Sequence, residues 1–274
     1  MESRLTTRIR QTVTAGSKAM GIFVTSGFPN PNVTLEILNA IDAGGADFIE
    51  LGMPFSDPLA EGLPIQQSSE RALAAGASMK TTMEAARRFR AGSDTPLLLM
   101  GYLNPVIRFG VSNFFQTAAS CGVDGVILPD LPPSERPLVA SAAEAAGVDV
   151  VQLIAPNTSD ERIRLVDDVS SGFVYAVSVT GLTGTGHGQS DAVNQYLRKA
   201  RALVTRNPLL VGFGISTHED AKRLCQHTDG FIVGSAVIRK VGALYGDSSL
   251  TSAERAAALS RFIRDLKQTK ASSR

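Results

Sequence analysis

Cysteine and histidine are scarce in this sequence, with two and three residues among 274. Cys121 and Cys225 are far apart in helix-like segments, which argues against a disulfide framework or a cysteine-based zinc site. His187, His218 and His227 form neither an H-x-H nor an H-E-x-x-H spacing, so the usual transition-metal sites are not indicated. We therefore expect no metal in this chain.

A charge excess of either sign is also missing, because 27 lysines and arginines face 26 aspartates and glutamates. Such a balance supplies no basic field for nucleic acid or anionic lipid, so any anion site must be local. The chain has no run of about 18 apolar residues, and its charged start, MESRLTTRIR, lacks the apolar segment of a signal peptide. We expect a cytoplasmic protein that binds neither nucleic acid nor membrane.

Short apolar runs rich in β-forming residues alternate with helix-like segments along the chain. The runs are GIFVT (21–25), DFIELG (47–52), PLLLMG (96–101), GVILPD (125–130), VVQLIAP (150–156), FVYAVS (173–178), LLVGFG (209–214) and GFIVGS (230–235). Because these runs are apolar on both faces, they predict parallel strands covered by helices. Eight strand-helix units is the number that closes a (β/α)8 or TIM barrel, a fold of the α/β class.

The chain is predicted to form a single barrel domain over residues 1–268, since no linker divides it. The segment LTTRIRQTV (5–13) predicts an extra N-terminal helix, and residues 269–274 are expected to be a disordered tail. Three helix starts fit the capping-box spacing, in which two side chains satisfy free N–H groups. The pairs are Thr158 with Glu161, Ser216 with Glu219, and Thr251 with Glu254.

The second apolar run ends on a glutamate, in the segment ELGMPFSDPLAEG (50–62). Side chains alternate along a strand, which puts Phe48 and Glu50 on one face and Ile49 and Leu51 on the other. Active sites of such barrels lie at the C-terminal ends of the strands, so Glu50 is predicted to point into the barrel mouth. A structural ion pair is the alternative, and it is the commoner role for a lone acidic residue.

Glycine-rich turns follow the last three predicted strands: TGLTGTGHG (180–188), GFGIST (212–217) and GSAVI (234–238). Backbone N–H groups at such turns and at helix N-termini bind phosphate without net positive charge, and barrels often hold phosphate after the seventh and eighth strands. A glycine turn can also be only a turn. Neither a P-loop nor a G-x-G-x-x-G after the first strand is present, so a nucleotide-binding fold is not indicated.

The lysines avoid the C-terminal ends of all eight predicted strands, which argues against Schiff-base chemistry. What remains is acid and base catalysis by carboxylates on a phosphorylated substrate, with Glu50, Glu61 and Asp57 as candidates. Aromatic residues near strand ends are more often core than site. Around a carboxylate, however, they could hold a flat apolar ring and raise the pKa of Glu50. The aromatic candidates are Phe23, Tyr102, Tyr175 and Phe213.

Four segments closely resemble, in order and spacing, the motifs of the tryptophan synthase alpha chain family. They are ELGMPFSDPLAEG, GVDGVILPDLPPSE, YAVSVTGLTG, and GFGIS followed by GFIVGSA. The resemblance implies a lyase that splits indole-3-glycerol phosphate into indole and glyceraldehyde 3-phosphate. It also implies a beta-chain partner in an α2β2 complex. Pyridoxal phosphate is then expected in that partner, with no cofactor in this chain.

The same resemblance assigns roles to individual residues. Glu50 matches the catalytic glutamate of the family, and Glu61 occupies the place of its second catalytic acid. Contacts to the substrate phosphate carry over to Gly184, Gly214, Gly234 and Ser235. The indole walls carry over to Phe23, Tyr175 and Phe213. Asp130 and Thr183 match positions that help close the site, and Asp57 and Asn104 match positions near the beta-chain contact.

The sequence departs from the family pattern at a few positions. Glu61 replaces an aspartate, which adds about 1.5 Å of reach, and Leu63 replaces a proline. Phe28 and Gly101 also differ from the usual residues. The change at position 61 motivates an alternative, a catalytically weak subunit that binds ligand and regulates the beta chain. Another phosphate-binding barrel enzyme, such as an isomerase of histidine or tryptophan biosynthesis, would lack the acids or lysines that it requires at the strand ends.

Overall fold

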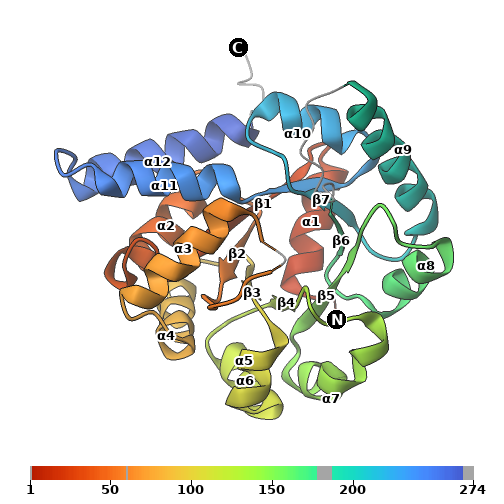
Figure 1. Cartoon of the computed structure of the whole chain (residues 1–274), viewed down its shortest axis with the longest axis horizontal. Helices are drawn as coiled ribbons and strands as arrows, with labels where there is room; N and C mark the ends of the chain where they lie inside the picture. The colour runs from red at the N-terminus through yellow and green to blue at the C-terminus, as the bar shows by residue number, and fades with distance from the viewer. Residues whose placement is uncertain (1, 60, 178–186, 268–274) are drawn as a thin grey trace.

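Eight parallel strands close into a barrel in the order of the sequence (Figure 1). The computed structural model describes residues 2–59, 61–177 and 187–267. The strands are β1 (Ala19–Thr25), β2 (Phe48–Gly52), β3 (Leu97–Met100), β4 (Gly125–Ile127), β5 (Asp149–Ile154), β6 (Val174–Val177), β7 (Leu209–Gly212) and β8 (Gly230–Val233). Strand β8 pairs with β1 and closes the ring. The predicted strands and the predicted barrel are confirmed.

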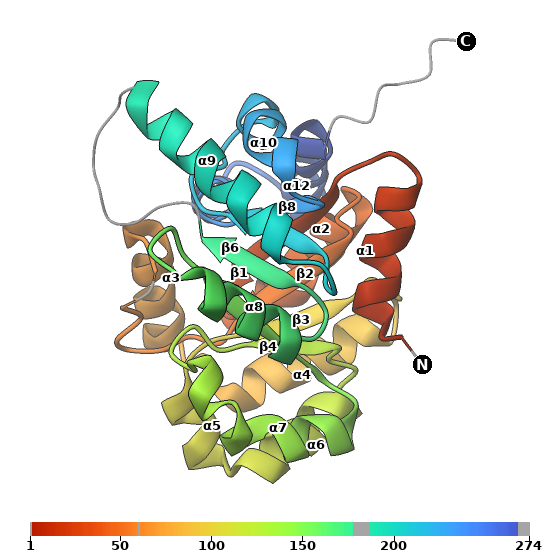
Figure 2. The same cartoon turned by 90° about the vertical axis from the view of Figure 1, so that its right-hand side faces the viewer.

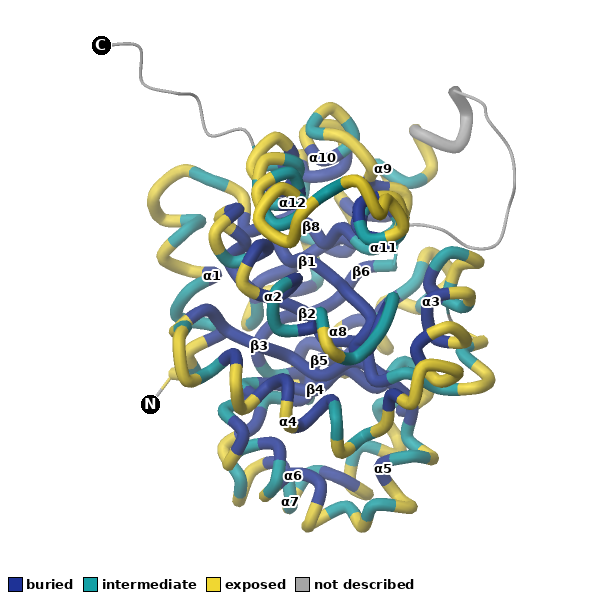
Figure 3. The backbone as a smooth tube through the Cα atoms, turned by 90° about the vertical axis from the view of Figure 1, so that its left-hand side faces the viewer, coloured by how far each residue is buried: buried dark blue, intermediate teal, exposed yellow. Residues whose placement is uncertain are grey.

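The predicted 269–274 tail lies outside the described residues. Helices surround the barrel (Figure 1). They are α1 (Arg4–Thr14), α2 (Thr34–Ala43), α3 (Leu63–Ala74), α4 (Met79–Arg90), α5 (Leu103–Phe109), α6 (Val111–Ser120), α7 (Pro137–Ala146), α8 (Asp160–Val169), α9 (His187–Leu203), α10 (His218–Leu224), α11 (Ser235–Gly246) and α12 (Ser252–Lys267). The strands are buried, with the barrel interior on one face and the surrounding helices on the other, whereas exposed residues lie on the helices (Figure 3). No helix in the described ranges combines the length and apolarity that crossing a bilayer requires.

Aromatic side chains fill the barrel interior below its mouth. Phe48 and Phe173 are fully buried with ring centroids 5.4 Å apart, and the Tyr175 ring follows at 6.0 Å from Phe173. Gly21 makes room for this layer, since a Cβ there would lie 2.3 Å from Cζ of Phe48. Glu50 comes two residues after Phe48 on the same face of β2 and lies one layer nearer the C-terminal end.

Helix α1 covers the N-terminal end of the barrel, at the end opposite to α3 (Figure 2). Leu5 is fully buried there. Arg4 forms an ion pair with Asp124 at 3.0 Å, and the Thr12 hydroxyl donates to Asp47 at 2.9 Å. Asp124 and Asp47 lie just before β4 and β2, so the helix is fastened to segments that lead into the barrel. The predicted extra helix is confirmed, and it closes this end.

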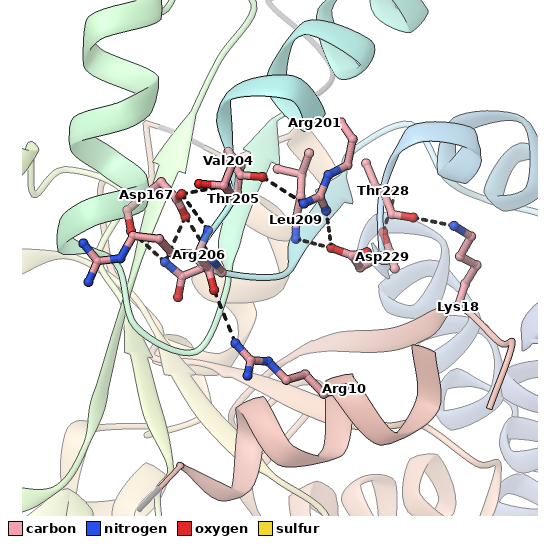
Figure 4. Close-up of polar contacts among 12 residues, drawn as sticks. Arg10, Lys18, Asp167, Arg201, Val204, Thr205, Arg206, Leu209, Thr228 and Asp229 are labelled. Carbon is pink, nitrogen blue, oxygen red and sulfur yellow. Dashed lines mark hydrogen bonds and ion pairs between the residues drawn. The ribbon is translucent and has the colours of Figure 1, made fainter. Parts of the chain in front are cut away.

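Hydrogen bonds hold the segment that leads into β7 at the same end (Figure 4). Asp167 accepts from the backbone N–H groups of Thr205, Arg206 and Asn207 at 2.7 to 3.0 Å. Arg10 of α1 donates to the carbonyl of Arg206 at 3.3 Å. Burial raises the pKa of Asp167, but these hydrogen bonds outweigh it, so the pKa is lowered. This end stabilises the fold, and the opposite end is where barrels place their chemistry.

The three predicted capping boxes have different outcomes. Thr251 and Glu254 form the predicted box at the start of α12, with Thr251 N–H donating to Glu254 at 2.8 Å. The other two predictions are wrong by one residue, because Ser159 and Thr217 are the N-caps of α8 and α10. Each has an extended backbone and a hydroxyl that accepts the N–H three residues on, and Asp220 completes the box with Thr217. Adjacent hydroxyl residues made the sequence signal ambiguous by one position.

Candidate active site

A cavity of about 200 Å³ lies at the C-terminal mouth of the barrel. Its lining includes eight residues predicted from sequence: Phe23, Glu50, Glu61, Tyr175, Phe213, Gly214, Gly234 and Ser235. It also includes residues that were not predicted: Ile65, Met100, Ile215, Ser216, Ile232 and Arg239. The predicted Thr183 and Gly184 lie outside the described residues.

Glu50 is a fully buried acid in the middle of β2, beside Phe23 in the register of β1 and β2. Neither of its carboxylate oxygens has a hydrogen-bond partner among the described residues, so the structural ion pair considered above is not found there. Burial raises the pKa of Glu50 well above 4.5, and the nearby charge of Glu61 raises it further. The side chain can therefore hold a proton that it could donate.

Glu61 reaches the same cavity from the loop between β2 and α3. Its backbone is fixed on both sides, because its N–H donates to Pro58 O at 3.1 Å and Gln66 donates to its carbonyl at 2.9 Å. Burial raises the pKa of Glu61 from 4.5 to about 7, and its buried Oε2 has no partner within the described ranges. Asp57, the third candidate acid, is exposed in the same loop. The cavity thus holds two acids whose pKa values are both raised by burial.

Three aromatic residues form the apolar walls of the cavity. The Phe23 ring passes over Gly52, where a Cβ would lie 2.6 Å from its Cζ. Tyr175 lies edge-on to Phe213 with ring centroids 6.4 Å apart. Phe213 has a φ of 72°, a left-handed conformation that costs a residue with a Cβ about 1–2 kcal/mol. This strained backbone turns the Phe213 ring to the cavity next to the acids.

The other side of the cavity is made of backbone at the ends of β7 and β8. Gly214 has a φ of 74°, and Ser235 is the first residue of α11. The N–H of Ile238 bonds to Gly234 O at 3.0 Å, so the N–H groups of the preceding turn have no acceptor within the helix. Free N–H groups and the positive end of the helix dipole favour an anion here.

Two predicted residues lie outside the lining of this cavity. Tyr102 follows β3, and its ring stacks on Phe55 of the loop after β2, with centroids 5.1 Å apart. Asp130, after β4, accepts the N–H of Leu103 at the start of α5 with both carboxylate oxygens at 3.0 Å. These contacts join the loops after β2, β3 and β4 around the mouth. They position the loops, and they bring neither side chain into the cavity.

The predicted partner residues are on the surface near these loops. Asp57 and Asn104 are both exposed. Large apolar side chains accompany them, with Leu59 90% and Ile107 52% exposed. Because the stacked rings of Phe55 and Tyr102 join the two segments, these residues belong to neighbouring parts of one rim. Exposed apolar groups together with polar ones are typical of a protein contact surface.

The departures from the family pattern have local explanations. Leu63 is the first residue of α3 and is exposed, and Pro64 directly after it supplies the proline that suits a helix start. Phe28 is buried, with the Arg71 guanidinium 5.2 Å from its ring centroid. At Gly101 a Cβ would lie 2.7 Å from Cε of Met53, so a larger residue would require Met53 to move.

A barrel mouth with two protonatable acids between aromatic rings, beside a helix N-terminus, defines an enzyme of the (β/α)8 class that works by acid and base catalysis. Within the described residues, no group of three or more histidine, cysteine or acidic side chains is placed to hold a metal ion.

Comparisons with known proteins identify the family. The family model for the tryptophan synthase alpha chain matches residues 9–270. Curated tryptophan synthase alpha chains from Geotalea uraniireducens (strain Rf4) and Azoarcus sp. (strain BH72) are 43% and 42% identical. The alignments cover 89% and 87% of this chain and 91% and 88% of the relatives.

Solved structures of tryptophan synthase resemble this chain as well. The tryptophan synthase subunit alpha from Legionella pneumophila str. Paris superposes with a TM-score of 0.86 at 33% identity, covering 97% of this chain and 98% of that one. An open form of tryptophan synthase from M. tuberculosis superposes with a TM-score of 0.85 at 28% identity, covering 97% of this chain and 99% of that one. This chain belongs to the tryptophan synthase alpha chain family, a family of lyases that cleave indole-3-glycerol phosphate.

Proposed function

We propose that this chain catalyses the alpha reaction of tryptophan synthase, in which indole-3-glycerol phosphate is cleaved to indole and D-glyceraldehyde 3-phosphate. The observation that carries the proposal is Glu50, a fully buried acid without a hydrogen-bond partner among the described residues, in one cavity with Glu61. An isolated buried carboxyl costs stability, so its presence in an apolar cavity favours a chemical role.

The first half of the reaction moves two protons. Glu50 in its protonated form donates a proton to C3 of the indole ring, and Glu61 takes the proton from the ring nitrogen. The raised pKa of Glu50 favours the protonated form that donates, and the pKa of about 7 lets Glu61 accept a proton near neutral pH. The ring then contains a C=N bond that can accept electrons.

The second half breaks the carbon–carbon bond. The Glu50 carboxylate takes the proton from the hydroxyl group next to the ring, and a C=O bond forms at that carbon. The electron pair of the broken bond moves into the ring, and Glu61 returns its proton to the nitrogen. Indole and glyceraldehyde 3-phosphate leave, and both acids have regained their starting protonation. No lysine or metal takes part in these steps.

Substrate binding follows from the two sides of the cavity. We assign the indole ring to the walls formed by Phe23, Tyr175 and Phe213, and the phosphate to the backbone at Gly214, Gly234 and Ser235. Thr183 and Gly184 remain predicted contacts from the segment outside the described residues. Tyr102 and Asp130 contribute through the loops that they hold around the mouth.

A beta chain is the partner that we propose for the rim around Asp57 and Asn104. The exposed Leu59 and Ile107 provide the apolar part of such a contact. We infer an α2β2 heterotetramer in which the beta chain carries pyridoxal phosphate and receives the indole, while this chain uses no cofactor. Its place in the cytoplasm stays a prediction from the sequence.

Release of indole from indole-3-glycerol phosphate by the purified chain, with and without a cognate beta chain, tests the proposal. We expect turnover that rises when the beta chain is added. Substrate binding without turnover under both conditions would instead support the alternative, a subunit that binds ligand and regulates the beta chain. Gel filtration that leaves the chain monomeric beside its beta chain would contradict the proposed complex.

A further inference from the structure

Arg239 is the one basic residue in the lining of the active cavity, within the part of the chain that the structure describes. It lies on α11, four residues after Ser235, so both side chains emerge on the same face of the helix. Gly214, Ser216 and Gly234 line the same cavity. Arg239 therefore lies at the side of the cavity where free backbone N–H groups favour an anion.

The guanidinium of Arg239 is available for a ligand. The side chain is exposed, and it has no ion pair and no hydrogen bond among the described residues. Two other basic residues of this part of the chain are engaged: Arg223 of α10 pairs with Asp220 at 3.0 Å, and the Lys240 ammonium lies 5.7 Å from the Phe262 ring centroid. Lys240 thus points to a different neighbour although it is next to Arg239 in sequence.

Charge in the cavity makes a cation useful at this position. Glu50 and Glu61 are the acids of the lining, and any ionised fraction repels an incoming phosphate. A helix N-terminus offers the equivalent of about half a positive charge, whereas a phosphate monoester carries about −1.5 to −2 at neutral pH. A guanidinium supplies a full charge and two parallel N–H donors that match phosphate oxygens.

We propose that Arg239 is a substrate-binding residue that contacts the phosphate of the substrate and selects phosphorylated over unphosphorylated indole compounds. The inference rests on the proposed function, since it assigns a residue to the substrate of that reaction. The contact is made in the ground state and kept in the transition state, because the phosphate is remote from the bond that breaks. Its loss should raise KM and leave kcat nearly unchanged.

The test compares Arg239→Ala, Arg239→Lys and the control Lys240→Ala, each as the full chain with a cognate beta chain. For Arg239→Ala we expect KM for indole-3-glycerol phosphate to rise about 10- to 100-fold, the size of a charged hydrogen-bonded contact, with kcat within about threefold. Arg239→Lys should lie between Arg239→Ala and the unmodified chain. Lys240→Ala should match the unmodified chain, because its charge faces Phe262.

Binding measurements keep the inference separate from the proposed function. Inorganic phosphate and indole are titrated into each variant by calorimetry, which needs no turnover. Arg239→Ala should weaken phosphate binding by a factor similar to the rise in KM and leave indole binding unchanged. Equal weakening of phosphate and indole, or unchanged phosphate binding, would overturn the role of Arg239. An unmodified chain without indole release would overturn the proposed function, while the phosphate titration would still decide on Arg239.

Discussion

Glu50 and Glu61 line one cavity, and the buried oxygens of both carboxyl groups lack hydrogen-bond partners within the described residues. Burial raises the pKa of each group, and the charge of Glu61 adds to the shift of Glu50. As neighbours of like charge, they titrate as a coupled pair. A pKa of about 7 leaves Glu61 partly ionised near neutral pH, and the upward shift of the Glu50 pKa favours its protonated form. One fold thus provides a proton donor and a proton acceptor from the same residue type.

Removing either acid should reduce indole release without preventing substrate binding. For Glu50→Gln and for Glu61→Gln we expect kcat to fall by about 10²- to 10⁴-fold, the usual contribution of a positioned acid or base. Glu61→Asp keeps the acid but shortens its reach, so its kcat should fall less than that of Glu61→Gln. Steady-state assays with the beta chain present measure these effects.

Glu70→Gln on the exposed surface of α3 is the matched control and should leave the rate unchanged. Circular dichroism of each variant shows whether the fold is kept. Full activity of Glu61→Gln together with an inactive Glu50→Gln would mean that Glu61 has no catalytic role.

The raised pKa of Glu61 also predicts how stability depends on pH. Folding raises this pKa from 4.5 to about 7, so the folded state holds the proton more tightly than the unfolded chain. The resulting stability is fully present below pH 4.5 and is lost as pH rises through about 7. Between pH 4.5 and 7.5, the free energy of unfolding of the unmodified chain should fall by up to about 3 kcal/mol relative to Glu61→Gln.

Urea unfolding of both proteins at pH 4.5 and at pH 7.5 measures this difference. Subtracting the free energies of unfolding of the two proteins at each pH removes the contribution of groups that titrate alike in both. The charge of Glu61 also raises the pKa of Glu50. Glu61→Gln therefore lowers the pKa of Glu50, which makes the stability of that variant depend still less on pH. A stability difference that is the same at the two pH values would show that Glu61 titrates normally in the folded protein.

The strands and Glu50 could be predicted because their signals are local. Runs that are apolar on both faces predict a covered parallel sheet, and strand alternation together with the usual place of barrel active sites put Glu50 on the interior face. Glu61 was one of three candidate acids, and the family resemblance singled it out, because a loop residue has no periodicity that fixes its direction. Asp130 carried over in the same way, whereas Tyr102 was a candidate because it lies near a strand end, and the structure shows both residues organising loops outside the cavity.

Arg239 and the backbone of Phe213 could not be predicted by the same means. A basic residue in an amphipathic helix ordinarily indicates a solvated face, and only the closed barrel shows that the first turns of α11 border the cavity. A positive φ is expected at glycine or asparagine, so nothing in the letters GFG indicates that phenylalanine adopts it. Both features depend on tertiary packing rather than on local sequence.

The left-handed backbone at Phe213 predicts an unusual order of stability for two substitutions. Phe213→Ala removes the ring and keeps a Cβ at a φ of 72°, whereas Phe213→Gly removes the ring and the strain together. The glycine variant should therefore be more stable than the alanine variant by about 1 kcal/mol. Both variants lose the wall that lies edge-on to Tyr175, so KM for the substrate should rise in both.

Phe231 on β8 provides the control for this comparison. It is buried like a core residue and is not among the residues with positive φ. At an ordinary strand position a protein with glycine is less stable than one with alanine by about 0.5–1 kcal/mol. Phe231→Gly should therefore be less stable than Phe231→Ala, the reverse of the order at Phe213. Urea unfolding of all four variants measures both differences. If alanine is as stable as glycine at position 213, the backbone there is unstrained, and the ring is turned to the cavity by packing alone.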